Sequence, residues 1–255
     1  MNPLRRSGPA PLVIAHRGAS AAAPENTMPA FAAAWAAGAG WVETDVQPTL
    51  DGVPVLLHDP DLDRTTDGRG PVRGRSAREV AALDAGRWFP DGAFTGTGVP
   101  PLSALLAELS PTRRLLLEIK GEHTRQQVRT VLRACRDSGQ DHRVLVQSFE
   151  VAALGHVRDL DPHRPLGLLV EELDDDPVAA CARVGACAYN PDHRALLDGL
   201  TRRPDLLDEL HRADVAVAVW TADDPADWAA LTDAGVDAII TNRPAELLGW
   251  LADRG

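Results

Sequence analysis

The sequence has few cysteines and no long hydrophobic run. Its three cysteines, Cys135, Cys181 and Cys187, are odd in number and lack Cys-x-x-Cys spacing, which favours reduced thiols over a disulfide framework or a zinc site. No run approaches the ~18 apolar residues of a membrane-spanning helix. The apolar run near the N-terminus is too short and too interrupted by proline for a signal peptide. We therefore expect a soluble cytoplasmic protein without stable membrane insertion.

Positive charge is also scarce. The formal net charge is -11, which argues against binding to nucleic acid or to an anionic membrane surface. An anionic substrate would need arginine, lysine or a metal ion to reverse the field locally. Among the 26 basic residues the only lysine is Lys120. The simplest origin of such a bias is codon usage, and a lysine retained despite it is a better functional candidate than an average lysine.

Several catalytic motifs are missing from the sequence. It has no Gly-x-Gly-x-x-Gly after the first apolar run, no P-loop, no Gly-x-Ser-x-Gly and no His-Glu-x-x-His. Nucleotide-binding, serine-hydrolase and zinc-protease functions therefore have no support.

Short apolar runs alternate with helical patterns along the whole chain. The runs are Leu12–Ala15, Trp41–Val46, Val53–Leu57, Leu115–Ile119, Val144–Val146, Leu166–Val170, Ala186–Tyr189, Val215–Trp220 and Ala238–Ile240. The helical patterns are Met28–Ala37, Leu102–Leu109, Arg125–Ser138, Val151–Asp159, Pro177–Val184, Pro204–Ala213, Pro225–Ala234 and Pro244–Ala252. This alternation implies a parallel sheet covered by helices. Eight such units in 255 residues favour a closed (β/α)8 barrel of the TIM type over an open doubly wound sheet.

The nine apolar runs exceed the eight strands of a barrel by one, and a hairpin explains the surplus. The second and third runs are separated by Leu50-Asp51-Gly52, and Asp-Gly is a strong hairpin signal. If Asp51-Gly52 is a two-residue turn, the numbers of paired residues sum to 103, which places His58 opposite Asp45. The second strand would then pass the barrel rim and return antiparallel.

Residues 60–101 are rich in Gly, Pro, Arg and Asp and have no clear period. The segment is long for a loop. We interpret it as a small insertion after the second strand, covering part of the barrel top, within a single domain spanning residues 1–255.

Three carboxylates are expected at two neighbouring strand ends. Glu43 and Asp45 are two residues apart and so point the same way from one strand, and Glu118 ends the run LLLEI. Their mutual repulsion would require a cation between them. An oxygen-only ligand set suits Mg²⁺ or Ca²⁺. The alternative is that these are solvated acids in the loops that follow the strands.

Two histidines and two cations accompany these acids. His16 ends the first strand and His58 the returning strand, and a pair of histidines at a barrel mouth can act as general acid and general base. The alternative for any one histidine is a structural role, and the other six offer no such constellation. Arg17 and Lys120 could hold phosphate oxygens, although Arg17 could equally be a surface charge.

Together these residues resemble the glycerophosphodiester phosphodiesterase family, over nearly the whole chain. The matching segments are AHRG (Ala15–Gly18), PENT (Pro24–Thr27), AF (Ala30–Phe31), ETDVQPTLDG (Glu43–Gly52), LLHD (Leu56–Asp59), RTTDGRG (Arg64–Gly70), LEIKGE (Leu117–Glu122), VQSF (Val146–Phe149), WT (Trp220–Thr221) and GVDAIITNRP (Gly235–Pro244). They follow the family's order, which makes the combination far more specific than any single motif.

The resemblance implies a TIM-type barrel with an insertion after its second strand. It implies hydrolysis of glycerophosphodiesters to sn-glycerol 3-phosphate and an alcohol such as choline, ethanolamine or glycerol. The implied roles are general acid and base for His16 and His58, ligands of Ca²⁺ or Mg²⁺ for Glu43, Asp45 and Glu118, and phosphate contacts for Arg17 and Lys120. Gln147, Phe149 and Trp220 are lesser candidates for the site lining.

Two short segments depart from the family pattern. Trp-Thr-Val-Asn is here Trp220-Thr221-Ala222-Asp223, and Thr-Asp before the late proline is Thr241-Asn242. Both lie at the rim of late strands, where we expect them to affect the leaving-group pocket more than the catalytic residues.

Two other functions are weighed against this one. A lysophospholipase D activity on the same barrel would need an apolar groove or rim helix, for which the insertion offers only Trp88, Phe89 and Phe94. A catalytically inactive relative that binds glycerophosphate would have lost a histidine or a ligand, and all five of these residues are present.

Overall fold

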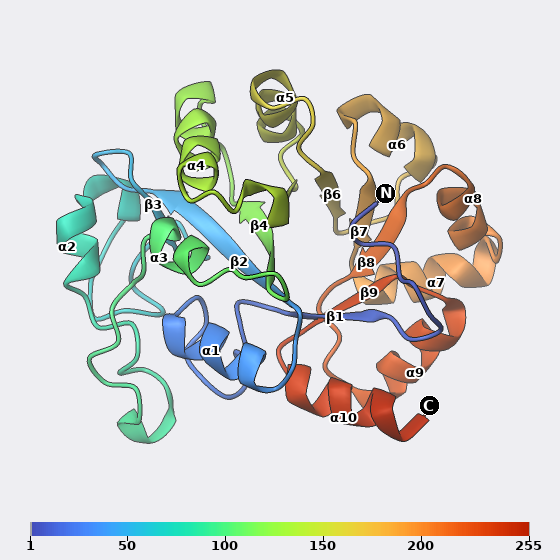
Figure 1. Cartoon of the computed structure of the whole chain (residues 1–255), viewed down its shortest axis with the longest axis horizontal. Coiled ribbons are helices and arrows are strands. Elements are labelled where there is room, and N and C mark those ends of the chain that lie inside the picture. Colours follow the sequence, from blue (N-terminus) through green and yellow to red (C-terminus); the bar gives the residue numbers. More distant parts are fainter. Residues whose placement is uncertain (1, 255) are drawn as a thin grey trace.

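Eight parallel strands close into a barrel in the computed structural model, which describes residues 2–254 (Figure 1). The strands are β1 (Leu12–Ala15), β2 (Trp41–Pro48), β4 (Arg114–Ile119), β5 (Val144–Ser148), β6 (Leu166–Val170), β7 (Ala188–Pro191), β8 (Ala216–Val219) and β9 (Ala238–Thr241). Each pairs with the next along the chain, and β1 pairs with both β2 and β9. This closure confirms the predicted (β/α)8 barrel.

The ninth strand, β3 (Pro54–Leu56), lies outside the barrel and pairs antiparallel with β2. The predicted register is wrong by one residue, because Gln47 pairs with Val55 and paired numbers sum to 102 rather than 103. The turn has three residues, and Gly52 closes it with φ of 78°, a conformation that glycine adopts readily. The backbone N–H of Leu57 therefore donates a hydrogen bond to the carbonyl oxygen of Asp45. Leu57 lies opposite Asp45, and His58 is the next residue along the chain.

Helices surround the barrel (Figure 1). They are α1 (Met28–Ala36), α2 (Ala77–Ala81), α3 (Leu102–Ala107), α4 (Arg125–Asp137), α5 (Val151–Leu160), α6 (Pro177–Val184), α7 (His193–Arg202), α8 (Leu206–Arg212), α9 (Pro225–Ala234) and α10 (Pro244–Arg254), with 3-10 turns at Val72–Gly74, Pro90–Gly92 and Asp141–Arg143. Within residues 2–254, none of the helices combines the length and apolar character needed to cross a bilayer.

Helix α7 was not predicted from the sequence. Asp192 caps it by accepting hydrogen bonds from the backbone N–H groups of Arg194 and Ala195, each over 2.9 Å. Gly199 in its interior weakens the helical pattern, while burial of Leu196 in the apolar core stabilises the helix in the fold.

Alternate side chains of the strands divide the core in two. One set packs between the strands and the helices, and the other fills the barrel. The barrel interior contains Leu4, Ile14, Trp41, Leu116, Leu145, Ala188, Ala216, Ala218, Ala238 and Ile240. Because side chains alternate along a strand, Glu43 and Asp45 share the inward direction of Trp41, and Glu118 shares that of Leu116. The strands thus carry apolar groups inside the barrel and acidic groups at its carboxyl end.

Residues 60–101 build a small apolar cluster of their own against β3. It consists of Val55, Leu57, Leu62, Val72, Val80, Ala85 and Val99. A bridge from Val55 to Pro101 joins the end of the segment to β3. The cluster holds in place the strand that leads to His58.

Candidate active site

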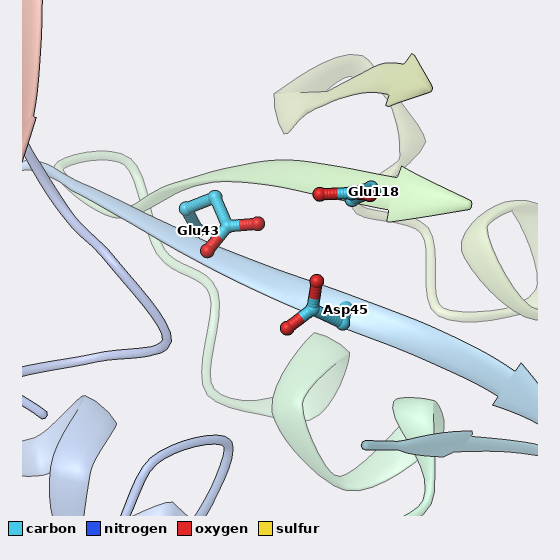
Figure 2. A group of neighbouring side chains, drawn as sticks. All are labelled: Glu43, Asp45 and Glu118. Atoms are coloured by element: carbon cyan, nitrogen blue, oxygen red, sulfur yellow. The ribbon is translucent and has the colours of Figure 1, made fainter. Parts of the chain in front are cut away.

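The three predicted acidic residues come together, with Glu43 and Asp45 in the middle of the long strand β2 and Glu118 one residue before the end of β4. Asp45 is the pairing partner of Glu118 across the two strands, and Glu43 lies one inward position earlier on β2. Figure 2 shows the three carboxylates directed toward a common space. One oxygen from each lies within 4.8 Å of the others, and all three side chains are buried. This burial rules out the alternative that the three residues are solvated acids in the loops that follow the strands.

Three carboxylates at this distance cannot all ionise easily in a buried space. Burial and the neighbouring acids raise the pKa of Glu43 well above its usual range, and burial followed by Asp45 raises the pKa of Glu118 to about 8. Burial also disfavours ionised Asp45, but Arg17, His58 and Lys120 hold its pKa below the ordinary value. A cation between the carboxylates would allow all three to ionise.

The donor chemistry of the cluster fits a hard divalent cation. Asp45 Oδ1 and Glu118 Oε1 are buried and accept no hydrogen bond among residues 2–254, although Lys120 Nζ lies 2.9 Å from Glu118 Oε1 in an ion pair. Carboxylate oxygens alone suit Ca²⁺ or Mg²⁺. A cation there would satisfy both oxygens and offset the repulsion.

His16 directly follows β1. Its backbone and its side chain both contact residues at the end of β9. Its backbone N–H donates to Thr241 O over 2.8 Å, and its Nδ1 lies 2.7 Å from Asn242 Oδ1. Burial, reinforced by the charge of Arg17, lowers the pKa of His16 to about 4. The imidazole is therefore neutral at physiological pH.

His58 has a carboxylate partner instead. Its Nδ1 lies 2.6 Å from Asp59 Oδ1, and Arg64 Nε donates to Asp59 Oδ2 over 2.6 Å. The pKa of Asp59 falls to about 2, with the hydrogen bond from Arg64 as its largest cause. Burial lowers the pKa of His58, while Asp45 and the hydrogen bond to Asp59 oppose that shift. The Nδ1 partner of His16 is thus the uncharged amide of Asn242, whereas that of His58 is the carboxylate of Asp59.

Arg17 is a largely enclosed part of the cluster rather than a surface charge, with 15% of its side chain exposed. Its backbone N–H donates to Glu43 Oε2 over 3.0 Å, its guanidinium donates to Glu25 Oε1 over 2.8 Å, and its Nε lies 3.1 Å from Asp45 Oδ2. Its φ of 55° is unusual for a residue with a side chain. These contacts fix the arginine beside the carboxylates.

A cavity of about 290 Å³ opens over this arrangement. Its lining is His16, Arg17, Glu43, His58, Glu118, Lys120, Gln147, Phe149, Leu169, Glu171, Trp220, Thr221 and Ile240. Six of the seven predicted site residues contribute to the wall, and the seventh, Asp45, has its carboxylate beside those of Glu43 and Glu118. Phe149 and Trp220 meet edge to face with ring centroids 5.4 Å apart, which gives one side of the cavity an apolar surface.

Several residues that hold the site were not singled out in the sequence. Asn26 Nδ2 donates to Asp45 Oδ2 over 2.9 Å, and Glu25 joins Arg17 to Arg64. Asn26 and Glu25 lie in the PENT segment, which marked them only as part of a motif. Their contacts depend on the left-handed backbone at Asn26, with φ of 57°, which no local pattern reveals.

The expectation for the two departing segments was wrong. None of the three departing residues, Ala222, Asp223 and Asn242, lines the cavity. Asn242 contacts His16 directly, and Asp223 contacts Asn242. The departures therefore concern the surroundings of a candidate catalytic residue rather than a leaving-group pocket.

The chain resembles known proteins over most of its length. Residues 16–246 match the model of the glycerophosphoryl diester phosphodiesterase family. The chain is 33% identical over 247 residues to a glycerophosphodiester phosphodiesterase of Caldanaerobacter subterraneus, covering 96% of this chain and 99% of the relative.

Two solved structures share the fold over nearly the full chain. A putative glycerophosphoryl diester phosphodiesterase from Silicibacter pomeroyi superposes with a TM-score of 0.88 at 31% identity, covering 99% of this chain and 96% of the other. A phosphodiesterase of Oleispira antarctica, in complex with the product sn-glycerol-3-phosphate, superposes with a TM-score of 0.87 at 27% identity, covering 95% and 97%.

Proposed function

Because the chain belongs to the glycerophosphoryl diester phosphodiesterase family, we propose that it hydrolyses glycerophosphodiesters to sn-glycerol 3-phosphate and an alcohol. The observation that carries this proposal is the single cavity whose wall includes His16, His58, Arg17 and Lys120 over a buried cluster of three carboxylates. A small anionic diester fits that combination of proton-transfer groups and cations.

Arg17 and Lys120 are the proposed phosphate contacts. Both lie on the cavity wall of a protein whose net charge is -11. Arg17 is fixed by three acidic neighbours, so its guanidinium can orient a phosphate with little loss of side-chain freedom. Lys120 Nζ stands 2.9 Å from Glu118 and 3.9 Å from Asp45, at the border between the carboxylates and the cavity. Together with a bound divalent cation, these two groups would offset the negative charge of the site toward a phosphate.

Glu43, Asp45 and Glu118 are the proposed ligands of a divalent cation, Ca²⁺ or Mg²⁺. When bound, such an ion neutralises negative charge that develops on phosphoryl oxygens. Asn26 holds Asp45 through one oxygen and leaves the other without a donor. The residues around the cluster thus orient its carboxylates toward the shared space.

His16 and His58 are the proposed proton-transfer groups. One takes the proton from the attacking oxygen, and the other gives a proton to the alcohol oxygen as its bond to phosphorus breaks. The attacking oxygen belongs either to water or to the neighbouring glycerol hydroxyl, and the second route forms a cyclic phosphate that water then opens. In both routes the net reaction consumes one water molecule.

A substrate panel coupled to detection of sn-glycerol 3-phosphate, and of choline for the two choline-containing substrates, tests the proposal. Detection of choline is needed because its release from lysophosphatidylcholine leaves lysophosphatidic acid and no sn-glycerol 3-phosphate. The panel contains glycerophosphocholine, glycerophosphoethanolamine, glycerophosphoglycerol and lysophosphatidylcholine, each with Ca²⁺, Mg²⁺, Mn²⁺ or excess EDTA. We expect turnover of the water-soluble diesters, loss of turnover in EDTA, and a loss of roughly 100-fold or more in His16→Ala and His58→Ala. The matched control is His163→Ala, since His163 is exposed.

Three outcomes would contradict the proposal. Full turnover in either catalytic variant would remove the histidine roles, and undiminished activity in EDTA would remove the cation. Preference for lysophosphatidylcholine would favour the lysophospholipase D activity. The structure gives that activity little support, because Phe89 stacks edge to face against both Trp88 and Phe94 instead of forming an open groove.

A further inference from the structure

Asn242 and Asp223 form a hydrogen-bonded pair that ends on His16. Asn242 follows β9 and Asp223 follows β8, so two neighbouring strand ends bring them together. Asn242 Nδ2 donates to Asp223 Oδ2 over 2.6 Å, and Asn242 Oδ1 lies 2.7 Å from His16 Nδ1. Since neither residue lines the cavity, the pair reaches the reaction only through the imidazole.

The carboxylate of Asp223 determines which way the Asn242 amide faces. Asp223 Oδ1 accepts hydrogen bonds from the backbone N–H of Asn242 and from Thr241 Oγ1, each over 2.8 Å. An ionised carboxylate only accepts hydrogen bonds. The amide must therefore turn its NH₂ group toward Asp223, and its carbonyl oxygen must face His16.

A carbonyl oxygen in this position determines where the imidazole carries its proton. Asn242 Oδ1 also lies 2.6 Å from the Ser20 hydroxyl, whose single hydrogen is shared between this oxygen and the carbonyl oxygen of His16. His16 Nδ1 can donate only if it carries a hydrogen. A neutral imidazole has one N–H, which leaves Nε2 with a free lone pair.

We propose that Asp223 and Asn242 are positioning residues that hold neutral His16 with its proton on Nδ1, so that an unprotonated Nε2 is presented to the substrate cavity. The inference rests on the proposed function, because it assigns a role toward the His16 of that same site. Nε2 is then ready to accept a proton, or a hydrogen bond, from a bound substrate without prior rearrangement of the ring.

Exchange of the two side chains gives a sharp test. In Asp223→Asn an amide replaces the acceptor-only group, so nothing compels the Asn242 carbonyl to face His16. We expect His16 to populate both tautomers and kcat/KM to fall roughly 10–100-fold, as for the loss of other groups that orient an imidazole. In the double variant Asp223→Asn with Asn242→Asp, the new carboxylate accepts from His16 and the new amide donates to it, so the original tautomer should return.

Nitrogen NMR of the full-length protein labelled with ¹⁵N-histidine reads the tautomer directly. The His16 signals are identified by their loss in His16→Gln, and spectra are recorded at pH 8. We expect widely separated Nδ1 and Nε2 signals in the native protein, with Nε2 at the position of an unprotonated nitrogen. The two signals should approach each other in Asp223→Asn and separate again in the double variant. Asp224→Asn is the matched control, since Asp224 only caps α9.

The spectra need no substrate, so the tautomer is tested separately from the proposed activity. Absence of diester turnover with the expected native spectrum would overturn the proposed function and leave the tautomer assignment intact. The inference is overturned if Nε2 carries the proton in the native protein. It is also overturned if Asp223→Asn, with its folding verified by circular dichroism, keeps native His16 signals and native kcat/KM.

Discussion

Ionisation of Glu118 is unfavourable because the side chain is buried beside Asp45. This predicts how the stability of the protein depends on pH. The pKa of Glu118 is about 8 in the folded protein, above the value of about 4.3 in an unfolded chain. Between these values the folded state binds more protons than the unfolded state, so stability without metal decreases as pH rises through this range. The ion pair with Lys120 only partly offsets the unfavourable ionisation.

We expect Glu118→Gln to be more stable than the native protein at pH 8 in EDTA, by about 1–3 kcal/mol. The difference should vanish below about pH 4.5, where the carboxyl is protonated in both states. Ca²⁺ should stabilise the native protein and have a much smaller effect on the variant. Urea denaturation across this pH range measures all three effects.

The exposed pair of Glu108 and Arg113 supplies the control for this experiment. Glu108→Gln should show neither the gain at pH 8 nor a changed response to Ca²⁺. A Glu118→Gln variant that is less stable than the native protein at pH 8 in EDTA would contradict this account of the cluster.

At the scale of elements, the turn between β1 and α1 sets the position of His16 and Arg17. Gly18 has φ of 83°, and a Cβ there would lie 2.6 Å from the backbone carbon of Ala30 in α1. Gly52 in the hairpin has φ of 78° but open space around it. At Gly18 both the backbone conformation and the close contact with Ala30 favour glycine. At Gly52 only the backbone conformation does.

We expect Gly18→Ala to lose at least 3 kcal/mol of stability, because the helix must move away from the strand end. Its kcat/KM should fall as well, since the loop carries His16 and Arg17. Gly52→Ala should cost about 1 kcal/mol for backbone strain alone. Gly8→Ala is the control, with no crowding and no positive φ. Equal stability of the Gly18 and Gly52 variants in urea denaturation would contradict the role of the Ala30 contact.

The strand ends and their acidic residues could be predicted because they depend on local alternation. Glu43 and Asp45 share one face of the strand with Trp41 because side chains alternate along it. The hairpin register could not be predicted, since one turn residue more or less shifts every pair. The contact of Asn242 with His16 depends on the closure of β9 against β1, more than two hundred residues apart. Such contacts follow from the complete barrel.

At the scale of the whole molecule, the two ends of the barrel have separate tasks. The carboxyl end carries the cavity, while the amino end is closed by the N-terminal segment. Asn2 Nδ2 donates to the carbonyl groups of Cys187 and Asp214, and buried Asp237 accepts from the backbone N–H of Arg6. These bonds place Leu4 in the barrel interior with no exposed surface. Conventional TIM barrels likewise separate activity from stability between their two faces.

Leu4→Ala should therefore lower stability without changing the chemistry. Removing this side chain leaves a space among strand residues that cannot easily move inward, so we expect a loss of about 2–5 kcal/mol in urea denaturation. At a temperature where the variant remains folded, kcat/KM for the best diester should stay within about twofold of the native value, because the cavity lies at the opposite end of the strands. Leu50→Ala is the matched control, since Leu50 is 69% exposed and its loss should change stability by less than about 0.5 kcal/mol. A large fall in kcat/KM with Leu4→Ala, at unchanged stability, would show that the two ends of the barrel are coupled.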